Sequence, residues 1–387
     1  MQNRLQSSAL LEFQEAAANL TNPVLQEWKT RGGKIIGMMY HYIPEEIITA
    51  AGMLPYRMRA TGSDGTELSE SRFTQVNCSL VRHLFDSGMR GNQNFLDGVV
   101  SVNNCDHIRR LYDNWKAKIK TPYTHFMSFP KKSGLEQAEA YRGELEGFIR
   151  SLVEQFDVDI SDEKLRNAIK LHNETRRLQR QLYALRKGDA PPISGAETLT
   201  AMVAASCMPR EYYNVRLAQL IEDCSKAEPS KNHLARIMVI GGEIDDPNFI
   251  AAIESQKGLV VTDLLGYGYR SFAKDVNTHG DPLTALADYQ VNERPADPRL
   301  FGRTTEERDM YISRLVHDFN IDGVISVRLM QCDHWGFEQV NLTKYLRKKR
   351  IPHLALETEY ILGSVGQLKT RVQAFVESIV EAKHVNN

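Results

Sequence analysis

Short apolar runs predict β-strands in two separated parts of the chain. They cover residues 34–40, 54–58 and 96–102 in the first part, and 236–240, 259–263, 321–327 and 351–357 in the second. Runs that are apolar on both faces are typical of a parallel sheet covered by helices. Helix-start signals separate the runs: Pro44 precedes Glu45 and Glu46 after the first, and Asp246 precedes Pro247 after the fourth. This alternation predicts an α/β protein.

Between these parts the apolar period changes from two to about 3.6. One apolar face is marked by Leu165, Ile169, Leu178, Leu182 and Leu185. Ser194 and Glu197 have the spacing of a helix capping box. Residues 4–30 also have helical spacing. The predicted organisation is a helical N-terminal arm (1–33), a first α/β domain (34–133), a helical insert (134–230) and a second α/β domain (231–387). Both α/β domains are expected to be open, mostly parallel, Rossmann-like sheets that resemble one another.

A repeated segment links the two α/β parts. Leu96–His107 reads LDGVVSVNNCDH, and Ile321–His334 reads IDGVISVRLMQCDH, with two inserted residues. The same strand is followed by the same Cys-Asp-His tripeptide, which indicates an internal duplication. We therefore expect two similar domains that face one another.

Charge and motifs exclude several classes of function. The 387 residues include 48 basic and 49 acidic side chains, so the formal net charge of −1 provides no field for nucleic acid. No stretch approaches the roughly 18 apolar residues of a membrane span, and no secretory signal pattern opens the chain. We expect a cytoplasmic protein. A P-loop motif is absent and Gly266 and Gly268 form only an incomplete dinucleotide fingerprint, so no nucleotide should bind.

Three of the five cysteines are candidates for chemistry. Cys105 and Cys332 follow predicted strand ends, where open parallel sheets bind ligands, and Cys78 precedes a predicted helix at residues 80–85. Their convergence would suit an iron–sulfur cluster with one open iron. A zinc site completed by His107 or His334, a nucleophilic cysteine and simple packing remain alternatives. Cys207 and Cys224 lie in the helical insert and are expected only to pack.

Five segments carry a resemblance to a known family over nearly the full length. They are residues 42–55, 76–82 around Cys78, 103–115 around Cys105, 331–338 around Cys332 and 366–377. Together they resemble the benzoyl-CoA reductase and 2-hydroxyacyl-CoA dehydratase family. Within it, the stretch NNCDHIRRLYDNW is most similar to the smaller core subunit of ATP-dependent benzoyl-CoA reductases.

The resemblance implies an oxygen-sensitive, cytoplasmic iron–sulfur subunit. One [4Fe-4S] cluster would be held by Cys78, Cys105 and Cys332. The implied partners are a larger homologous core subunit, ATPase subunits with their own [4Fe-4S] cluster, a low-potential ferredoxin donor and an acyl-CoA substrate. The implied reaction is the two-electron reduction of benzoyl-CoA to cyclohexadienoyl-CoA. A 2-hydroxyacyl-CoA dehydratase subunit is one alternative, and a subunit that relays electrons while its partner binds acyl-CoA is another.

Ring protonation requires a positioned acid. His41, after the first strand, is the first candidate, although an exposed loop histidine is the plainer interpretation. Glu243, after the fourth strand, is the second, with capping of the next helix as its alternative. Asp106 and Asp333 are predicted to N-cap the helices that follow them. Trp335 is predicted to pack rather than to stack on substrate.

Overall fold

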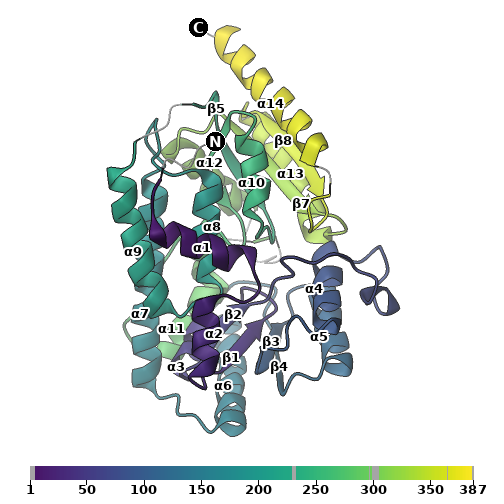
Figure 1. Cartoon of the computed structure of the whole chain (residues 1–387), viewed down its shortest axis with the longest axis vertical. Coiled ribbons are helices and arrows are strands. Elements are labelled where there is room, and N and C mark those ends of the chain that lie inside the picture. The colour runs from purple at the N-terminus through teal and green to yellow at the C-terminus, as the bar shows by residue number, and fades with distance from the viewer. Residues whose placement is uncertain (1–4, 229–231, 296, 299–304, 364, 386–387) are drawn as a thin grey trace.

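Two four-stranded parallel sheets form the centre of the molecule and confirm the predicted fold class. The computed structural model describes residues 5–228, 232–295, 297–298, 305–363 and 365–385. The first sheet contains β1 (Ile35–Met38), β2 (Leu54–Arg57), β3 (Gly98–Val102) and β4 (Tyr123–Met127). The second contains β5 (Ala235–Gly241), β6 (Gly258–Leu264), β7 (Gly323–Leu329) and β8 (His353–Thr358). The two sheets lie one above the other in Figure 1.

Both sheets have the same strand order. The first runs β2-β1-β3-β4 and the second runs β6-β5-β7-β8. Corresponding strands are therefore β1 with β5, β2 with β6, β3 with β7 and β4 with β8. The shared order extends the sequence repeat to the whole of each sheet.

The Asp-Gly pair of the repeat has the same role in both sheets. The carboxylate of Asp97 accepts the N–H of Ile35 at 2.9 Å, and that of Asp322 accepts the N–H of Arg236 at 2.7 Å. Each aspartate thus fixes the start of the third strand against the first strand of its sheet. These aspartates were predicted as strand residues, but the strands begin one position later, at the glycines.

Helices surround the sheets and connect them. The first part contains α1 (Ser8–Ala18), α2 (Pro23–Thr30), α3 (Glu45–Ala50), α4 (Ser79–Met89) and α5 (Asp106–Lys118). The middle contains α6 (Leu135–Phe156), α7 (Asp162–Ala184), α8 (Gly195–Ala205) and α9 (Arg210–Lys226). The last part contains α10 (Pro247–Glu254), α11 (Pro282–Asp288), α12 (Thr305–Asp318), α13 (Asp333–Lys348) and α14 (Val365–Val385). Short helices cover Ser69–Ser71, Tyr269–Ser271 and, as a π-helix, Tyr289–Glu293.

The middle helices contact both sheet regions. Helix α7 packs on α3 and on α11, and α8 packs on α10 and β6. Helix α1 packs on α8 and α9 and so covers this part of the middle layer. Figure 1 shows α7 and α9 along one side of both sheets. The Ser194–Glu197 capping box predicted for α8 is confirmed. The expected boundary at residues 230 and 231 lies outside the described residues.

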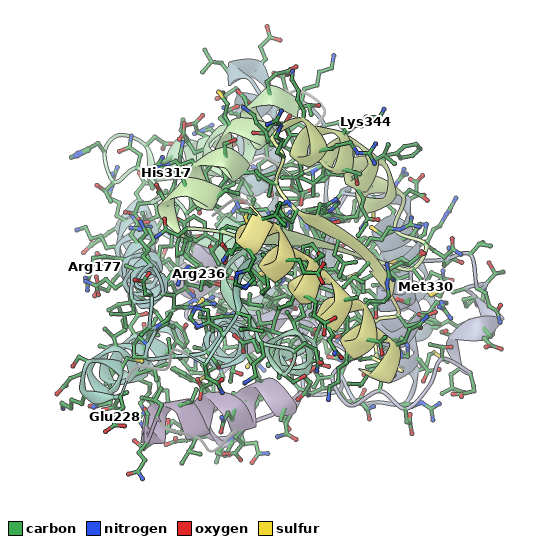
Figure 2. The ribbon with its side chains drawn as sticks, turned by 90° about the horizontal axis from the view of Figure 1, so that it is seen from above. Arg177, Glu228, Arg236, His317, Met330 and Lys344 are labelled. Atoms are coloured by element: carbon green, nitrogen blue, oxygen red, sulfur yellow. The ribbon has the colours of Figure 1, made fainter. Side chains whose placement is uncertain are left out.

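Arg236 on β5 also ties the middle segment to the second sheet. It is buried and donates to the carbonyls of Arg186, Lys187 and Gly188 beyond α7. Seen from above, it lies in the interior, whereas His317 and Lys344 lie at the periphery (Figure 2). Within the described ranges, no helix combines the length and the apolar character that crossing a bilayer requires.

Candidate functional site

Each of the three candidate cysteines is the N-cap residue of a helix. Cys78 precedes α4, Cys105 precedes α5 and Cys332 precedes α13. The prediction that Asp106 and Asp333 cap these helices is wrong, because both already belong to the first helical turn. The cysteines hold the non-helical cap conformation, so their thiols lie at the positive ends of three helix dipoles.

One cavity of about 80 Å³ is lined by all three cysteines. Both α/β domains form its walls, because Cys78 and Cys105 come from the first and Cys332 comes from the second. Its remaining lining is mainly apolar and includes Leu80, Ile108, Leu329 and Trp335. Burial raises the pKa of the Cys78 thiol, and the nearby thiols of Cys332 and Cys105 raise it further. The structure thus brings together the three cysteines that the repeat and the resemblance singled out.

The candidate donors of this cavity are three thiols, with His107 and His334 in the same lining. In the described ranges, no group of three or more His, Cys, Asp or Glu side chains is arranged to hold one metal ion. His107 Nδ1 accepts the Cys78 N–H at 2.7 Å and so supports the Cys78 backbone. His107 and His334 also line the cavity, so a zinc site of three cysteines and a histidine stays an alternative. A four-iron cluster is held by thiolates on separate irons, and three thiols in an apolar interdomain cavity meet that requirement.

The other two cysteines are buried apart from this cavity. Cys207 is 0% exposed and its thiol contacts the carbonyls of Ala16 and Ala204. Cys224 is 1% exposed on α9. Neither lines the cysteine cavity, which agrees with the expected packing role.

His41 and Glu243 follow corresponding strands and meet between the domains. His41 comes after β1 and Glu243 after β5, and His41 Nδ1 lies 3.2 Å from Glu243 Oε1. The plainer interpretation of His41 as an exposed loop residue is wrong, since it is 8% exposed. Burial lowers the pKa of His41 to about 3, so the ring is neutral at pH 7. Glu243 does not cap the next helix, because Asp246 accepts the N–H of Asn248 there.

Arg57, at the end of β2, completes this contact. Its guanidinium pairs with Glu243, approaches His41 Nδ1 at 3.1 Å and donates to the Gly266 carbonyl at 2.8 Å. It also lies 3.8 Å from the ring centroid of Tyr267. Glu243 lines the cysteine cavity, whereas His41 and Arg57 line a second cavity behind it. The three residues thus connect the two cavities through hydrogen bonds.

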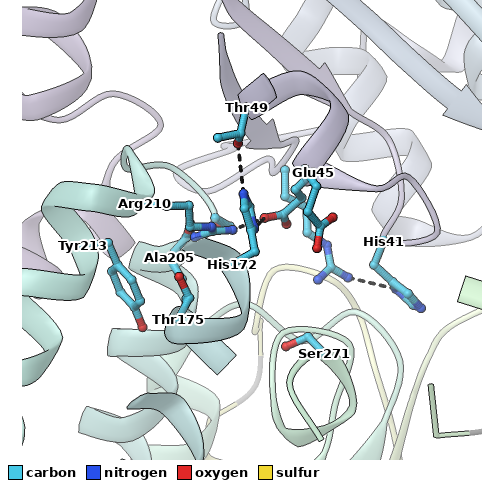
Figure 3. Close-up of polar contacts among 12 residues, drawn as sticks. His41, Glu45, Thr49, His172, Thr175, Ala205, Arg210, Tyr213 and Ser271 are labelled. Atoms are coloured by element: carbon cyan, nitrogen blue, oxygen red, sulfur yellow. Dashed lines mark hydrogen bonds and ion pairs between the residues drawn. The ribbon is translucent and has the colours of Figure 1, made fainter. Parts of the chain in front are cut away.

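The second cavity is polar, and sequence reasoning missed it. Arg210 on α9 pairs with Glu45 (Figure 3). Arg176 on α7 pairs with Glu46. His172 Nε2 lies 2.9 Å from Thr49 Oγ1. The two glutamates were interpreted only as favourable charges at a helix start. A detectable signal was present, because Arg176 lies seven residues after Ile169 and so on the apolar face of its helix.

Comparison with known proteins identifies the family. Residues 40–379 match the family model described as 2-hydroxyglutaryl-CoA dehydratase, D-component. The chain belongs to this family. The match includes all three cavity cysteines, both strand-end candidates His41 and Glu243, and both sheets apart from the first strand.

Individual relatives in the 2-hydroxyglutaryl-CoA dehydratase D-component family have different substrates in their names. The chain is 26% identical over 361 residues to a benzoyl-CoA reductase subunit of Thauera aromatica, covering 92% of this chain and 93% of the relative. It is 26% identical over 385 residues to the beta subunit of (R)-2-hydroxyglutaryl-CoA dehydratase of Acidaminococcus fermentans, covering 96% and 99%. It is 24% identical over 380 residues to the (R)-phenyllactyl-CoA dehydratase beta subunit of Clostridium sporogenes, covering 95% and 98%. Each relative is named as one subunit of an enzyme that acts on a CoA thioester.

Proposed function

We propose that this chain is the iron–sulfur subunit of a CoA-thioester enzyme and holds one [4Fe-4S] cluster through Cys78, Cys105 and Cys332. The observation that carries the proposal is the single cavity lined by these three thiols, each at a helix N-terminus. Such a cluster supplies one-electron transfer at low potential and leaves one iron without a cysteine ligand. The partners would be a larger homologous core subunit and an ATPase with its own cluster, supplied by a low-potential ferredoxin.

The reaction that we propose first is the reduction of benzoyl-CoA. Two electrons and two protons convert its aromatic ring into cyclohexadienoyl-CoA. The likeness to the benzoyl-CoA reductase subunit of Thauera aromatica and the NNCDHIRRLYDNW segment support this choice. A lyase is the second candidate, because the family model and two of the three relatives are named as dehydratases.

Glu243 and His41 are the proposed route of a proton to the substrate. Glu243 faces the cysteine cavity and contacts His41 Nδ1 at 3.2 Å. The ion pair with Arg57 keeps Glu243 as a carboxylate, so Glu243 must accept a proton before it can give one to the substrate. This proton would enter from the polar cavity that His41 lines and pass through the His41 ring to the Glu243 carboxylate. Arg57 holds the Glu243 carboxylate in place through its ion pair. General acids act in this way when they lie within hydrogen-bond reach of the reacting group.

Iron analysis of cysteine variants tests the ligand set. We expect Cys105→Ala, purified without oxygen, to lose the iron and the visible absorption of a cluster. Cys207→Ala is the matched control, because it removes a buried thiol that does not line the cavity. Iron content that is the same in both variants would refute the assignment.

Product analysis distinguishes the two reactions. The anaerobic complex is given benzoyl-CoA or a 2-hydroxyacyl-CoA, together with reductant and ATP. Ring reduction consumes ATP in every turnover and yields a cyclic diene, whereas dehydration uses a recyclable electron and therefore needs ATP only catalytically. Water loss without a reduced ring would establish the dehydratase. A structure with acyl-CoA bound only at the partner's cluster would instead favour an electron-relay role for this chain.

A further inference from the structure

Trp335 has a buried hydrogen-bond donor that the protein does not satisfy. It lies in the first turn of α13, three residues after Cys332. Trp335 lines the cysteine cavity and also a smaller cavity of about 30 Å³ that Arg270 lines. The side chain is 5% exposed, and Nε1 has no hydrogen-bond partner among the described residues. Buried donors without a partner cost free energy and are therefore rare in native proteins.

The other two tryptophans of the chain have partners for this group. Trp28 Nε1 donates to the Lys34 carbonyl at 3.0 Å, and Trp115 Nε1 donates to Thr121 Oγ1 at 2.9 Å. Of the three indole N–H groups, only that of Trp335 lacks a partner among the described residues.

The surroundings of Trp335 hold the indole in this position. Gly242 lines the same cavity. A Cβ atom at this position would lie only 2.9 Å from Trp335 Nε1, so the indole edge fits here because residue 242 has no side chain. The Arg270 guanidinium lies 5.0 Å from the indole centroid. Arg270 is itself fixed, since it donates to Asp297 and to the carbonyls of Gly241 and Leu264 at 2.5 Å each. A cation on the ring face withdraws electron density from the indole and strengthens its N–H as a donor.

We propose that Trp335 Nε1–H donates a hydrogen bond to a sulfur atom of the cluster and raises its reduction potential. This inference rests on the proposed function, because it requires a cluster at the three cysteines. One-electron reduction adds negative charge that is shared by the sulfurs. A fixed N–H donor stabilises the reduced form more than the oxidised form, and such hydrogen bonds are known determinants of cluster potentials. Trp335 is a positioning and tuning residue and need not touch the substrate.

The test is a redox titration of the anaerobically purified full chain, followed by electron paramagnetic resonance. Trp335→Phe keeps an aromatic ring but removes the N–H, and Trp28→Phe removes an indole N–H away from the cavity. At a fixed applied potential, we expect the ratio of reduced to oxidised cluster in Trp335→Phe to fall about tenfold, equivalent to about 59 mV for a one-electron couple. Trp28→Phe should match the original chain. An unchanged midpoint in Trp335→Phe with full iron content would overturn the inference and leave the proposed function intact.

A second measurement decides the matter if Trp335→Phe does not retain iron. The original chain is produced with tryptophan labelled with ¹⁵N in the indole ring, and the reduced cluster is examined by pulsed magnetic resonance. We expect a ¹⁵N coupling that persists in Trp28→Phe. Its absence in a chain with full iron content would overturn the inference. A chain that binds no iron at all would overturn the proposed function as well, so the two failures are distinguishable.

Discussion

The buried ion pair between Glu46 and Arg176 should contribute strongly to stability. Glu46 lies in α3 and its side chain is 1% exposed, while Arg176 lies in α7 and its side chain is 10% exposed. Arg176 also donates to Asn173 Oδ1 and lies over the ring of Tyr289. Glu46→Gln removes the negative charge that pairs with the buried Arg176 guanidinium. Such a change costs about 3–5 kcal/mol.

The neighbouring pair on the same helix is the matched control. Arg177 contacts Glu174 at 2.6 Å, but both side chains are nearly half exposed. Exposed pairs contribute at most about 1 kcal/mol, so Glu174→Gln should have little effect. The two variants therefore make the same chemical change at glutamates that pair with neighbouring arginines of α7, one pair buried and one exposed.

Thermal and urea unfolding measure the difference. At about 2.1 cal/mol/K per residue, the chain has an unfolding entropy of roughly 0.8 kcal/mol/K, so 3–5 kcal/mol corresponds to a Tm lowered by about 4–6 °C. Glu174→Gln should lower Tm by about 1 °C or less. The double variant Glu46→Leu with Arg176→Met should recover most of the loss, because no charge remains buried. Equal Tm values for the two single variants would refute the reasoning.

Three further predictions concern single positions. Gly242→Ala places a Cβ 2.9 Å from Trp335 Nε1, so it should displace the indole and lower the cluster potential in a redox titration; an unchanged midpoint would contradict the proposed tuning. Burial lowers the pKa of His353 to about 4, so the folded state binds a proton less readily than the unfolded state does. The free energy of unfolding should therefore fall as the pH decreases from 6.5 towards 4, by at most about 1.4 kcal/mol per pH unit. Urea unfolding at pH 7.5 and 5.5 should show a smaller loss for His353→Gln, and an equal loss would exclude this cause. Gly268→Ala places a Cβ 1.7 Å from Asp263 Oδ1. Urea unfolding should show a loss of stability of about 1–3 kcal/mol, and an unchanged stability would contradict the steric argument.

Most of the sheet framework could be predicted from the sequence, because buried parallel strands are continuous apolar runs. β4 was missed, since it is an edge strand whose three central residues are only half-buried. Its pattern therefore lacks the apolar run that marks the central strands.

The cysteines and their cavity were predictable for a different reason. The duplicated Cys-Asp-His tripeptide identified two positions, and the ends of parallel strands lie at one edge of a sheet. The arginine partners could not be predicted, because their contacts join distant segments: 186 positions separate Arg57 from Glu243, and 130 separate Glu46 from Arg176. No local pattern reports which buried carboxylate an arginine meets.

The correspondence between the two sheets also has an evolutionary consequence. His41 and Glu243 follow equivalent strands and contact one another, as Cys105 and Cys332 follow equivalent strands and share a cavity. Contacts between equivalent positions are the signature of a two-fold axis. This two-fold relation agrees with the internal duplication that the repeated Cys-Asp-His segment indicates. The first half supplies two of the cavity thiols and the second half supplies one, so the set of thiols is asymmetric although Cys105 and Cys332 follow equivalent strands.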